Sequence, residues 1–207
     1  MGFRYLRRYT NLPSTLHVLQ NRELTLLNPN TWDDRNDAHY IAEFKRRVGA
    51  KSVLALCFAA TKETYHHWRV FSGGSDGVCL EFDLDTLSRY FDRDSQLTYK
   101  LVMYKEIKDA PRTRLRNLPF LKRSPFSDER EFRLIYVDMN QELNFATCKI
   151  PLSSIRRVTL SPWMPQPLVD AVKNSILSAK GCHGLEVYRS TLIENERWKR
   201  AALTARK

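Results

Sequence analysis

The stretch Phe126-Ser-Asp-Glu-Arg-Glu-Phe-Arg-Leu-Ile-Tyr136 carries the strongest structural signal in the chain. Side chains of a β-strand point alternately to its two faces. A strand over residues 129–137 therefore places Glu129, Glu131 and Arg133 on one face. The opposite face is apolar and carries Phe132, Leu134 and Tyr136. Two carboxylates beside a guanidinium could hold a small polar ligand and assist a bond cleavage. The alternative interpretation is a solvated face with a Glu–Arg pair.

Strands follow one another along the rest of the chain without regular alternation with helices. The apolar run Ser52–Phe58 predicts a central strand that is buried on both faces. The patterns predict further strands at 3–9, 23–27, 78–82, 97–104, 145–150, 156–160 and 184–189, and helices at 14–20, 38–47, 63–71, 85–91 and 166–179. This order favours an α+β fold with a mixed, mostly antiparallel sheet and flanking helices over a doubly wound sheet. We expect a single domain over residues 1–192 and a charged helical tail over 193–207.

Polar segments between these elements predict caps and loops. Ser14 is expected to cap the helix at 14–20, and Asn36 and Asp37 the helix at 38–47. The basic, poorly periodic stretch Lys108–Arg123 predicts a mobile loop or lid. The glycine loop Ser72–Gly77 precedes a strand and lacks the Lys-Ser/Thr of a phosphate-binding P-loop. We therefore favour a hairpin turn there, which could still form one wall of a pocket.

Composition indicates a folded globular protein with an affinity for anions. Hydrophobic residues make up 43% of the 207 residues, and Lys and Arg outnumber Asp and Glu by 34 to 23, a formal net charge of +11. Such an excess favours a nucleic acid or an acidic protein as partner. The four widely spaced cysteines indicate buried reduced thiols rather than disulfides or a zinc site. With no apolar signal core and no membrane-spanning run, we expect a cytoplasmic protein that does not contact membranes.

A histidine pair next to a tryptophan is the other chemically notable motif. His66 and His67 are adjacent on a predicted helix, where neighbouring side chains diverge by about 100°. They cannot chelate one metal ion side by side, so we predict no metal site. Trp68 fits either a core anchor or the wall of a ligand site.

In their order along the chain, several segments resemble DUF2971, a bacterial domain family of long-unassigned function. The resemblance spans roughly residues 3–160 and rests on Phe3-Arg-Tyr5, Leu24–Pro29, Trp32-Asp-Asp-Arg-Asn-Asp37, Cys57-Phe58, Trp68, Gly77–Phe82, Lys122 and Glu129-x-Glu131-x-Arg133. That family looks similar to ADP-ribosyltransferase-like toxins and is linked to toxin–antitoxin and phage-defence settings. The resemblance therefore implies an ADP-ribosyltransferase-like fold, NAD as cofactor, and an antitoxin as a further partner.

The resemblance also implies roles for individual residues. Glu129 or Glu131 would be the catalytic glutamate, which stabilises the cation formed as nicotinamide leaves NAD⁺ and orients the acceptor. Arg4 and Tyr5 would grip the dinucleotide, with Trp68 stacking on it. Arg133 would neutralise a phosphate or hold the glutamate in place.

Two other functions are compatible with the sequence. One is a nucleic-acid-binding module without catalysis, in which the basic surface binds the ligand and the 129–133 face is structural. The other is an RNA-cleaving toxin that uses His66 or His67 as an acid–base group. The sequence contains no H-E-x-x-H or Walker A motif to support classical hydrolase chemistry.

Overall fold

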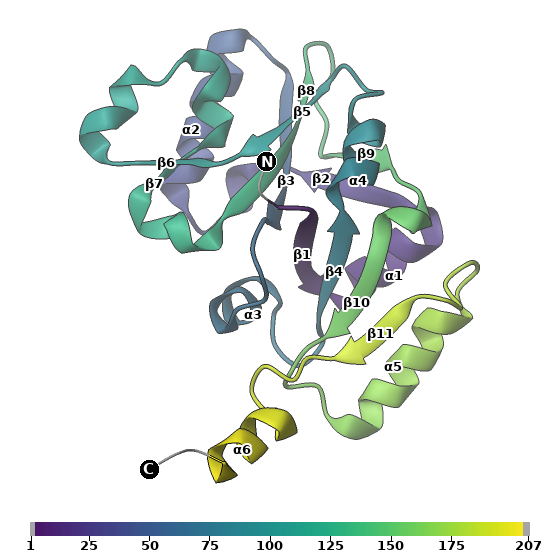
Figure 1. The fold of residues 1–207 in the computed structure, drawn as a ribbon. Helices are drawn as coiled ribbons and strands as arrows, with labels where there is room; N and C mark the ends of the chain where they lie inside the picture. The colour runs from purple at the N-terminus through teal and green to yellow at the C-terminus, as the bar shows by residue number, and fades with distance from the viewer. Residues whose placement is uncertain (1–2, 205–207) are drawn as a thin grey trace.

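Strand β3 (Ser52–Ala59) is the strand around which the main sheet is organised in the computed structural model, which describes residues 3–204 (Figure 1). Seven of its eight residues are buried, as its continuous apolar sequence predicts. The sheet has nine strands in the order β11-β10-β4-β1-β3-β2-β9, and β8 and β5 extend it from β3. The central position predicted for this segment is confirmed.

The remaining strands of this sheet are short and lie mostly antiparallel to their neighbours. They are β1 (Tyr5–Asn11), β2 (Glu23–Leu27), β4 (Gly77–Asp83), β5 (Leu97–Leu101), β8 (Glu131–Asp138), β9 (Phe145–Lys149), β10 (Ile155–Leu160) and β11 (Glu186–Arg189). Among its pairs only β10 and β11 are parallel. The predicted α+β fold with a mixed, mostly antiparallel sheet is therefore confirmed.

The sheet opens along one edge of β3. On its other edge β3 pairs with β8 from Ser52↔Asp138 to Ala59↔Glu131. On the opening edge, β1 meets β3 only at Arg7↔Ala59 and β2 meets it only at Leu27↔Ala55. Side chains of β1 satisfy carbonyl groups that the strand ladder leaves free, because Arg8 Nη1 donates to the Cys57 carbonyl at 3.0 Å and Arg7 donates to the Thr61 carbonyl.

Helices cover the two faces of the sheet unequally. α1 (Leu12–Asn21), α4 (Leu84–Phe91) and α5 (Gln166–Ser178) bury one face in the main hydrophobic core. On the opposite face, α2 (Arg35–Val48) packs on β3 and β8 in a second cluster. α3 (Tyr65–Phe71) covers β1 and β4 in a third cluster, and Figure 1 shows α2 and α3 well apart. The sheet between these two helices is the region that neither of them covers.

The segment between β5 and β8 forms a small lobe beside α2. It contains the parallel pair β6 (Met103–Lys105) and β7 (Leu121–Arg123), and the 3-10 helices η2 (Ile107–Arg112), η3 (Leu115–Phe120) and η4 (Ser124–Glu129). Short 3-10 helices and a strand thus form most of the segment Lys108–Arg123, for which a mobile loop or lid was predicted. Two further 3-10 turns are η1 (Pro29–Thr31) and η5 (Leu152–Ser154).

Several predicted boundaries are wrong for local reasons. The cap of α1 is Asn11, whose side chain accepts from the Ser14 amide, and the cap of α2 is Asp34. β8 begins at Glu131, because Arg130 adopts a left-handed conformation with φ 48° that separates the η4 turn from the strand.

Two segments at the margins of the sheet complete the fold. The loop Ser72–Asp76 joins helix α3 to β4, so it is not a hairpin turn between two strands. α6 (Glu196–Leu203) is an exposed helix in the predicted tail, of which residues 205–207 lie outside the described part. Within residues 3–204, no helix has both the length and the apolar character needed to cross a bilayer.

The apolar face of β8 supports a first prediction. Phe132 is fully buried and its ring packs against those of Phe3, Phe58 and Tyr99. We expect Phe132→Ala to lower the free energy of unfolding by about 3–5 kcal/mol, since the change removes buried surface and leaves a cavity. Urea denaturation measures this loss. Phe145→Ala, at a ring that is 59% exposed, is the matched control and should cost less than about 1 kcal/mol. Equal losses in the two variants would show that this face is not the core.

Candidate functional site

Arg133 is the centre of a buried ionic cluster on the face of β8 that α2 covers. Its side chain is fully buried, and each of its five N–H groups donates one hydrogen bond. Nε and Nη2 bind the carboxylate of Glu131 at 2.7 and 2.9 Å. Nη1 and Nη2 bind Asp37 at 2.8 and 2.7 Å, and Nη1 also binds the Pro119 carbonyl at 2.7 Å. Arg133 therefore ties β8 to α2 and η3.

Lys122 is the second cation of this cluster. Its Nζ lies 2.6 Å from Glu129, 3.5 Å from Glu131 and 3.9 Å from Asp37, and its side chain is 8% exposed. We call Asp37, Lys122, Glu129, Glu131 and Arg133 the Arg133 cluster. Its three carboxylates and two cations leave a net charge of −1 when all five groups are ionised.

The two glutamates differ in how readily they ionise. Burial disfavours the charged form of Glu131, but Arg133 outweighs burial and holds its pKa at about 2. Burial raises the pKa of Glu129, and Lys122 only partly opposes that shift. Burial also favours the neutral amine of Lys122, yet Glu131 and Glu129 outweigh it and raise the pKa of Lys122. Glu131 is thus a permanent carboxylate, whereas Glu129 is the one better suited to exchange a proton.

His67 fixes the turn that carries Glu129. Its ring is 1% exposed, Nε2 lies 3.0 Å from the Glu129 carbonyl, and Nδ1 pairs with the Thr64 hydroxyl. A carbonyl can only accept, so Nε2 carries the proton and Nδ1 accepts from Thr64. Burial lowers the pKa of His67, which favours this neutral tautomer. The Tyr9 ring stacks on the imidazole at 5.4 Å between centroids and completes the support of the turn.

A cavity of about 760 Å³, here called the sheet cleft, lies where β1 and β3 diverge. One wall consists of the cluster residues Asp37, Lys122, Glu129 and Glu131. The facing walls come from 7–11 of β1, 57–59 of β3, and the end of α3 with its glycine loop. The volume falls within the range of about 300–1,000 Å³ that is usual for ligand sites.

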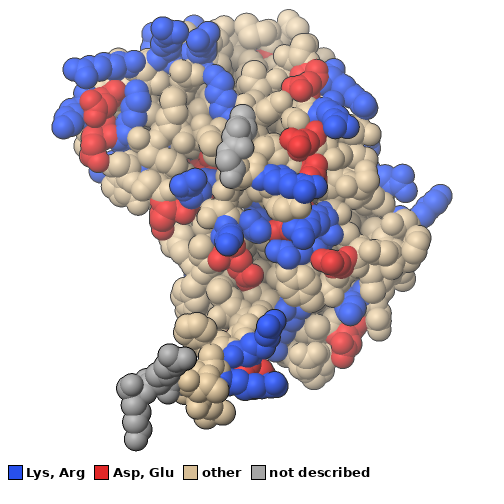
Figure 2. Space-filling view, in the orientation of Figure 1, with Lys and Arg blue, Asp and Glu red and all other residues tan. Residues whose placement is uncertain are grey.

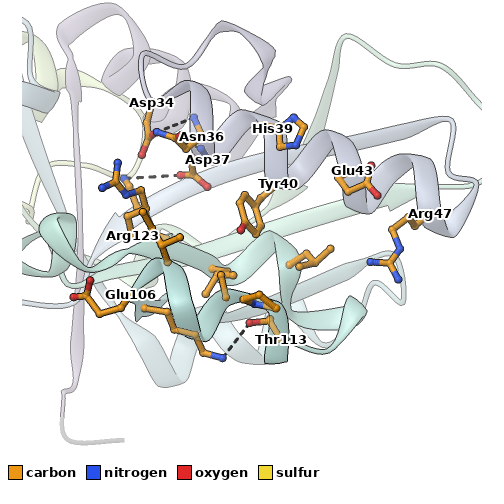
Figure 3. Close-up of a pocket in the computed structure, with 17 residues that line it drawn as sticks. Asp34, Asn36, Asp37, His39, Tyr40, Glu43, Arg47, Glu106, Thr113 and Arg123 are labelled. Atoms are coloured by element: carbon orange, nitrogen blue, oxygen red, sulfur yellow. Dashed lines mark hydrogen bonds and ion pairs between the residues drawn. The ribbon is translucent and has the colours of Figure 1, made fainter.

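A second cavity of about 640 Å³, here called the α2 cavity, lies between α2 and the 105–123 segment (Figure 3). Figure 3 shows Tyr40, Glu43 and Arg47 along α2 facing this segment. Asp34, Asp37 and Lys122 line both cavities. The two spaces are therefore neighbours on either side of the Arg133 cluster.

The structure separates the residues predicted for the site into two groups. Glu129 and Glu131 line the sheet cleft, and Arg133 holds Glu131 from behind without reaching the cavity. Arg4 and Tyr5 are not among the residues that line the cleft. The Arg4 side chain is 72% exposed, pairs with Asp83 at 3.4 Å, and lies over the Tyr5 ring.

Trp68 is fully buried against Tyr9, and its Nε1 donates to Glu63 at 2.7 Å. Of the two interpretations of Trp68, a core anchor or the wall of a ligand site, the structure therefore supports the core anchor. His66, in contrast, is half-exposed, and its Nε2 lies 3.9 Å from Asp128.

The glycine loop at 72–77 lines the cleft, as the sequence allowed, but sequence reasoning missed most of the other walls. Arg7 and Arg8 follow the predicted Arg4-Tyr5 pair on the same strand and line the cleft in its place. Asp37 was expected to cap a helix and was otherwise noted only as part of the family resemblance. Lys122 was noted only as part of the family resemblance. Nothing local in the sequence indicates that Asp37 and Arg133, which are 96 residues apart, are partners.

Comparisons with known proteins give limited information. No protein-family model matches the chain, and no curated protein matches it. Three solved structures of DarT from Thermus sp. 2.9 are similar to it, in complex with carba-NAD⁺, NAD⁺ and ADP-ribosylated single-stranded DNA. Their sequence identities are 8%, 8% and 10%, and their TM-scores are 0.45, 0.46 and 0.44. Each covers 92% of this chain, and the chain covers 97%, 96% and 95% of theirs. Such a similarity identifies neither family nor activity, so function must be argued from the site.

The Arg133 cluster supports a prediction about stability. Arg133→Met keeps most of the side-chain volume but leaves Asp37 and Glu131 buried without their cation. We expect a loss of about 3–5 kcal/mol in the free energy of unfolding, measured by urea denaturation. The triple variant with Asp37→Asn and Glu131→Gln should recover part of this loss, because it removes both uncompensated charges. Arg116→Met, at an exposed arginine, is the control, and a loss there as large as that of Arg133→Met would contradict the argument.

The depressed pKa of Glu131 supports a prediction about pH. The ordinary pKa of a glutamate is 4.5 and the folded value is about 2, so Glu131 stabilises the fold fully above pH 4.5 and loses this effect as pH falls toward 2. The difference in unfolding free energy between the wild type and Glu131→Gln should therefore shrink by about 3 kcal/mol over that interval. Urea titrations from pH 2.5 to 7 measure it. A difference that stays constant with pH would show that Arg133 does not hold Glu131 ionised.

Proposed function

We propose that the chain is an NAD⁺-dependent ADP-ribosyltransferase, with the ADP-ribosyltransferase-like fold and the DUF2971 membership that its sequence resemblance implies. The observation that carries the proposal is the composition of the sheet cleft. Two glutamates on a rigid ionic cluster form one wall, and the arginine-containing strand β1 forms another. A dinucleotide with a cationic ring at one end and a diphosphate in its middle complements these two walls.

The charge of the Arg133 cluster suits the reacting end of NAD⁺. With all five groups ionised the cluster carries a net charge of −1 beside the cavity, so a cationic group placed there is stabilised. The nicotinamide ring of NAD⁺ is cationic, and the ribosyl carbon becomes cationic as the ring departs. Because Arg133 holds Glu131 by two hydrogen bonds, its carboxylate would need little reorganisation to stabilise that charge.

Arg8 suits the diphosphate. Within residues 3–204 it makes no ion pair, and its hydrogen bond to the Cys57 carbonyl is made by Nη1 alone. Burial lowers the pKa of Arg8, which means that its charge lacks full compensation. Arg7 also lines the cleft, but its guanidinium is shared with Glu81. Arg8 is therefore the cation most available to an incoming phosphate.

The two glutamates would divide the chemistry between them. The glycosidic C–N bond of NAD⁺ breaks, and its electron pair leaves with neutral nicotinamide. The carboxylate of Glu131 stabilises the ribosyl cation that remains. An acceptor oxygen or nitrogen then bonds to this carbon and gives its proton to Glu129, whose raised pKa makes it the better base. The net charge of +11 favours a nucleic acid as acceptor.

The RNA-cleaving hypothesis receives less support from the histidines. Both ring nitrogens of His67 are engaged, and its ring is 1% exposed, so it is not free to shuttle protons. Of the described residues that line the sheet cleft, His67 is the only histidine. A non-catalytic nucleic-acid-binding module would leave the differing ionisation of Glu129 and Glu131 without a role.

Nicotinamide release from NAD⁺ tests the proposal. We expect Glu129→Gln to lower the steady-state rate by about 10²–10⁴-fold, the usual contribution of a general base, because each turnover ends with the proton transfer to Glu129. Glu131→Gln should lower it by a comparable factor, because the transition-state charge loses its fixed carboxylate. The matched control is Glu142→Gln at an exposed glutamate, which should retain full activity. Chromatographic detection of nicotinamide gives the rates, and wild-type protein that releases none would refute the proposal.

A further inference from the structure

The α2 cavity is lined by four Lys or Arg and four Asp or Glu, and its carboxylates are engaged by groups other than Arg47 and Arg123. Glu43 is bound by Arg46 through two hydrogen bonds, at 2.7 and 2.8 Å. Glu106 accepts from the Ser124 hydroxyl, and Asp37 is held by Arg133. The carboxylates on this wall are therefore already engaged.

The last lining carboxylate, Asp34, uses Oδ1 to accept from the amides of Asn36 and Asp37, which caps α2. Its Oδ2 is buried and has no hydrogen-bond partner in the described part of the chain. A hydroxyl or amino group of a ligand would satisfy this acceptor, whereas a second anion would not.

Three cations that line the same cavity have no carboxylate partner. Arg47 and Arg123 make no ion pair or side-chain hydrogen bond with residues 3–204, and Lys105 donates only to the Thr113 hydroxyl, at 3.0 Å. Figure 3 shows Arg47 and Arg123 at opposite ends of the cavity. The lobe itself is basic, since seven Lys or Arg and only two acidic residues lie in 105–123. Figure 2 shows Lys and Arg side chains gathered over the region of α2 and this lobe at the upper left, with acidic side chains among them.

Apolar and aromatic groups lie between the two guanidinium groups. Tyr40 projects into the middle of the cavity, as Figure 3 shows. Opposite it, the segment after β6 contributes Ile107, which is 73% exposed, together with Ala110 and Pro111. A half-buried aromatic ring between two cationic ends suits a ligand with a planar ring between two anionic groups.

We propose that the α2 cavity binds a single-stranded nucleic acid. One unpaired base stacks on Tyr40, and the flanking phosphates contact Arg123 at one end and Arg47 at the other. A base or sugar group donates to Oδ2 of Asp34. A duplex does not fit this mode, because its bases are stacked on one another and cannot reach Tyr40.

The position of the cavity assigns the bound strand a role. Lys122 and Asp37 line both cavities, so a strand in the α2 cavity reaches the edge of the Arg133 cluster that holds Glu129. The strand is therefore the acceptor of the ADP-ribosyl group. This role rests on the proposed function, whereas strand binding itself does not.

Fluorescence anisotropy with labelled ten-nucleotide single strands of DNA and of RNA, without NAD⁺, tests the inference. We expect Arg47→Gln with Arg123→Gln to weaken binding about tenfold or more. This double variant should also reduce the slope of log affinity against log salt by about 1.4, since each lost phosphate contact accounts for about 0.7. Both arginines are exposed and unpaired, so the variant should fold. The control is Arg89→Gln with Arg93→Gln, two exposed arginines at α4 that remove the same charge and should weaken binding less than twofold.

Substitutions of Tyr40 distinguish the contribution of base stacking to binding from that of charge. Tyr40→Ala should weaken binding about fivefold or more without changing the salt slope, and Tyr40→Phe should restore affinity because the ring is retained.

Equal losses in the arginine pair and its control would overturn the inference, as would equal affinity for a duplex. Tighter binding of a polyglutamate peptide than of either strand would indicate an acidic protein as the ligand. Normal nicotinamide release without strand binding would refute this inference alone, and strand binding without nicotinamide release would refute only the proposed function.

Discussion

The buried guanidinium of Arg133 is the interaction on which the site depends. Its five hydrogen bonds join β8, α2 and η3, three segments that are far apart in the sequence. A buried arginine is costly unless every N–H finds an acceptor, so its presence fixes the positions of Asp37 and Glu131 together. The Trp32 ring, 5.0 Å from the guanidinium, adds a cation–π contact and further restricts it. The result is a carboxylate held in one orientation at the wall of a cavity.

The sheet supplies the second constraint, because it leaves a space for that carboxylate to face. β1 and β3 share a single paired position and then diverge. Such an opening exposes backbone carbonyls, and the chain satisfies two of them with Arg7 and Arg8. The two arginines that satisfy these carbonyl groups therefore also line the cleft. α2 and α3 leave this part of the sheet uncovered, since each packs on different strands.

The sequence predicts the fold better than it predicts the site. Period-two alternation places Phe132 and Leu134 in the core and Glu131 and Arg133 on the opposite face, as observed. The alternation pattern wrongly placed Glu129 in the strand, because the left-handed Arg130 keeps β8 from starting before Glu131. A non-glycine residue gives no sign of this conformation in the sequence. The dinucleotide grip was assigned to Arg4 and Tyr5 by the family resemblance, and Arg4 lies just before β1. Only the three-dimensional pairing of β1 with β3 brings Arg7 and Arg8 to the cleft instead.

The environments of Glu129 and Glu131 show how one cluster can give two carboxylates different properties. Both are buried, and both lie within 3.5 Å of Lys122. Of the two glutamates Arg133 binds only Glu131, so burial dominates the pKa of Glu129 while the guanidinium dominates that of Glu131. Among residues 3–204, Lys122 is the one cation that contacts the more easily protonated group, and it also borders both cavities. An anion that draws Lys122 toward the α2 cavity would weaken its hold on Glu129 and raise the pKa of that carboxylate further. Ligands in the two cavities would then be coupled through a single ammonium group.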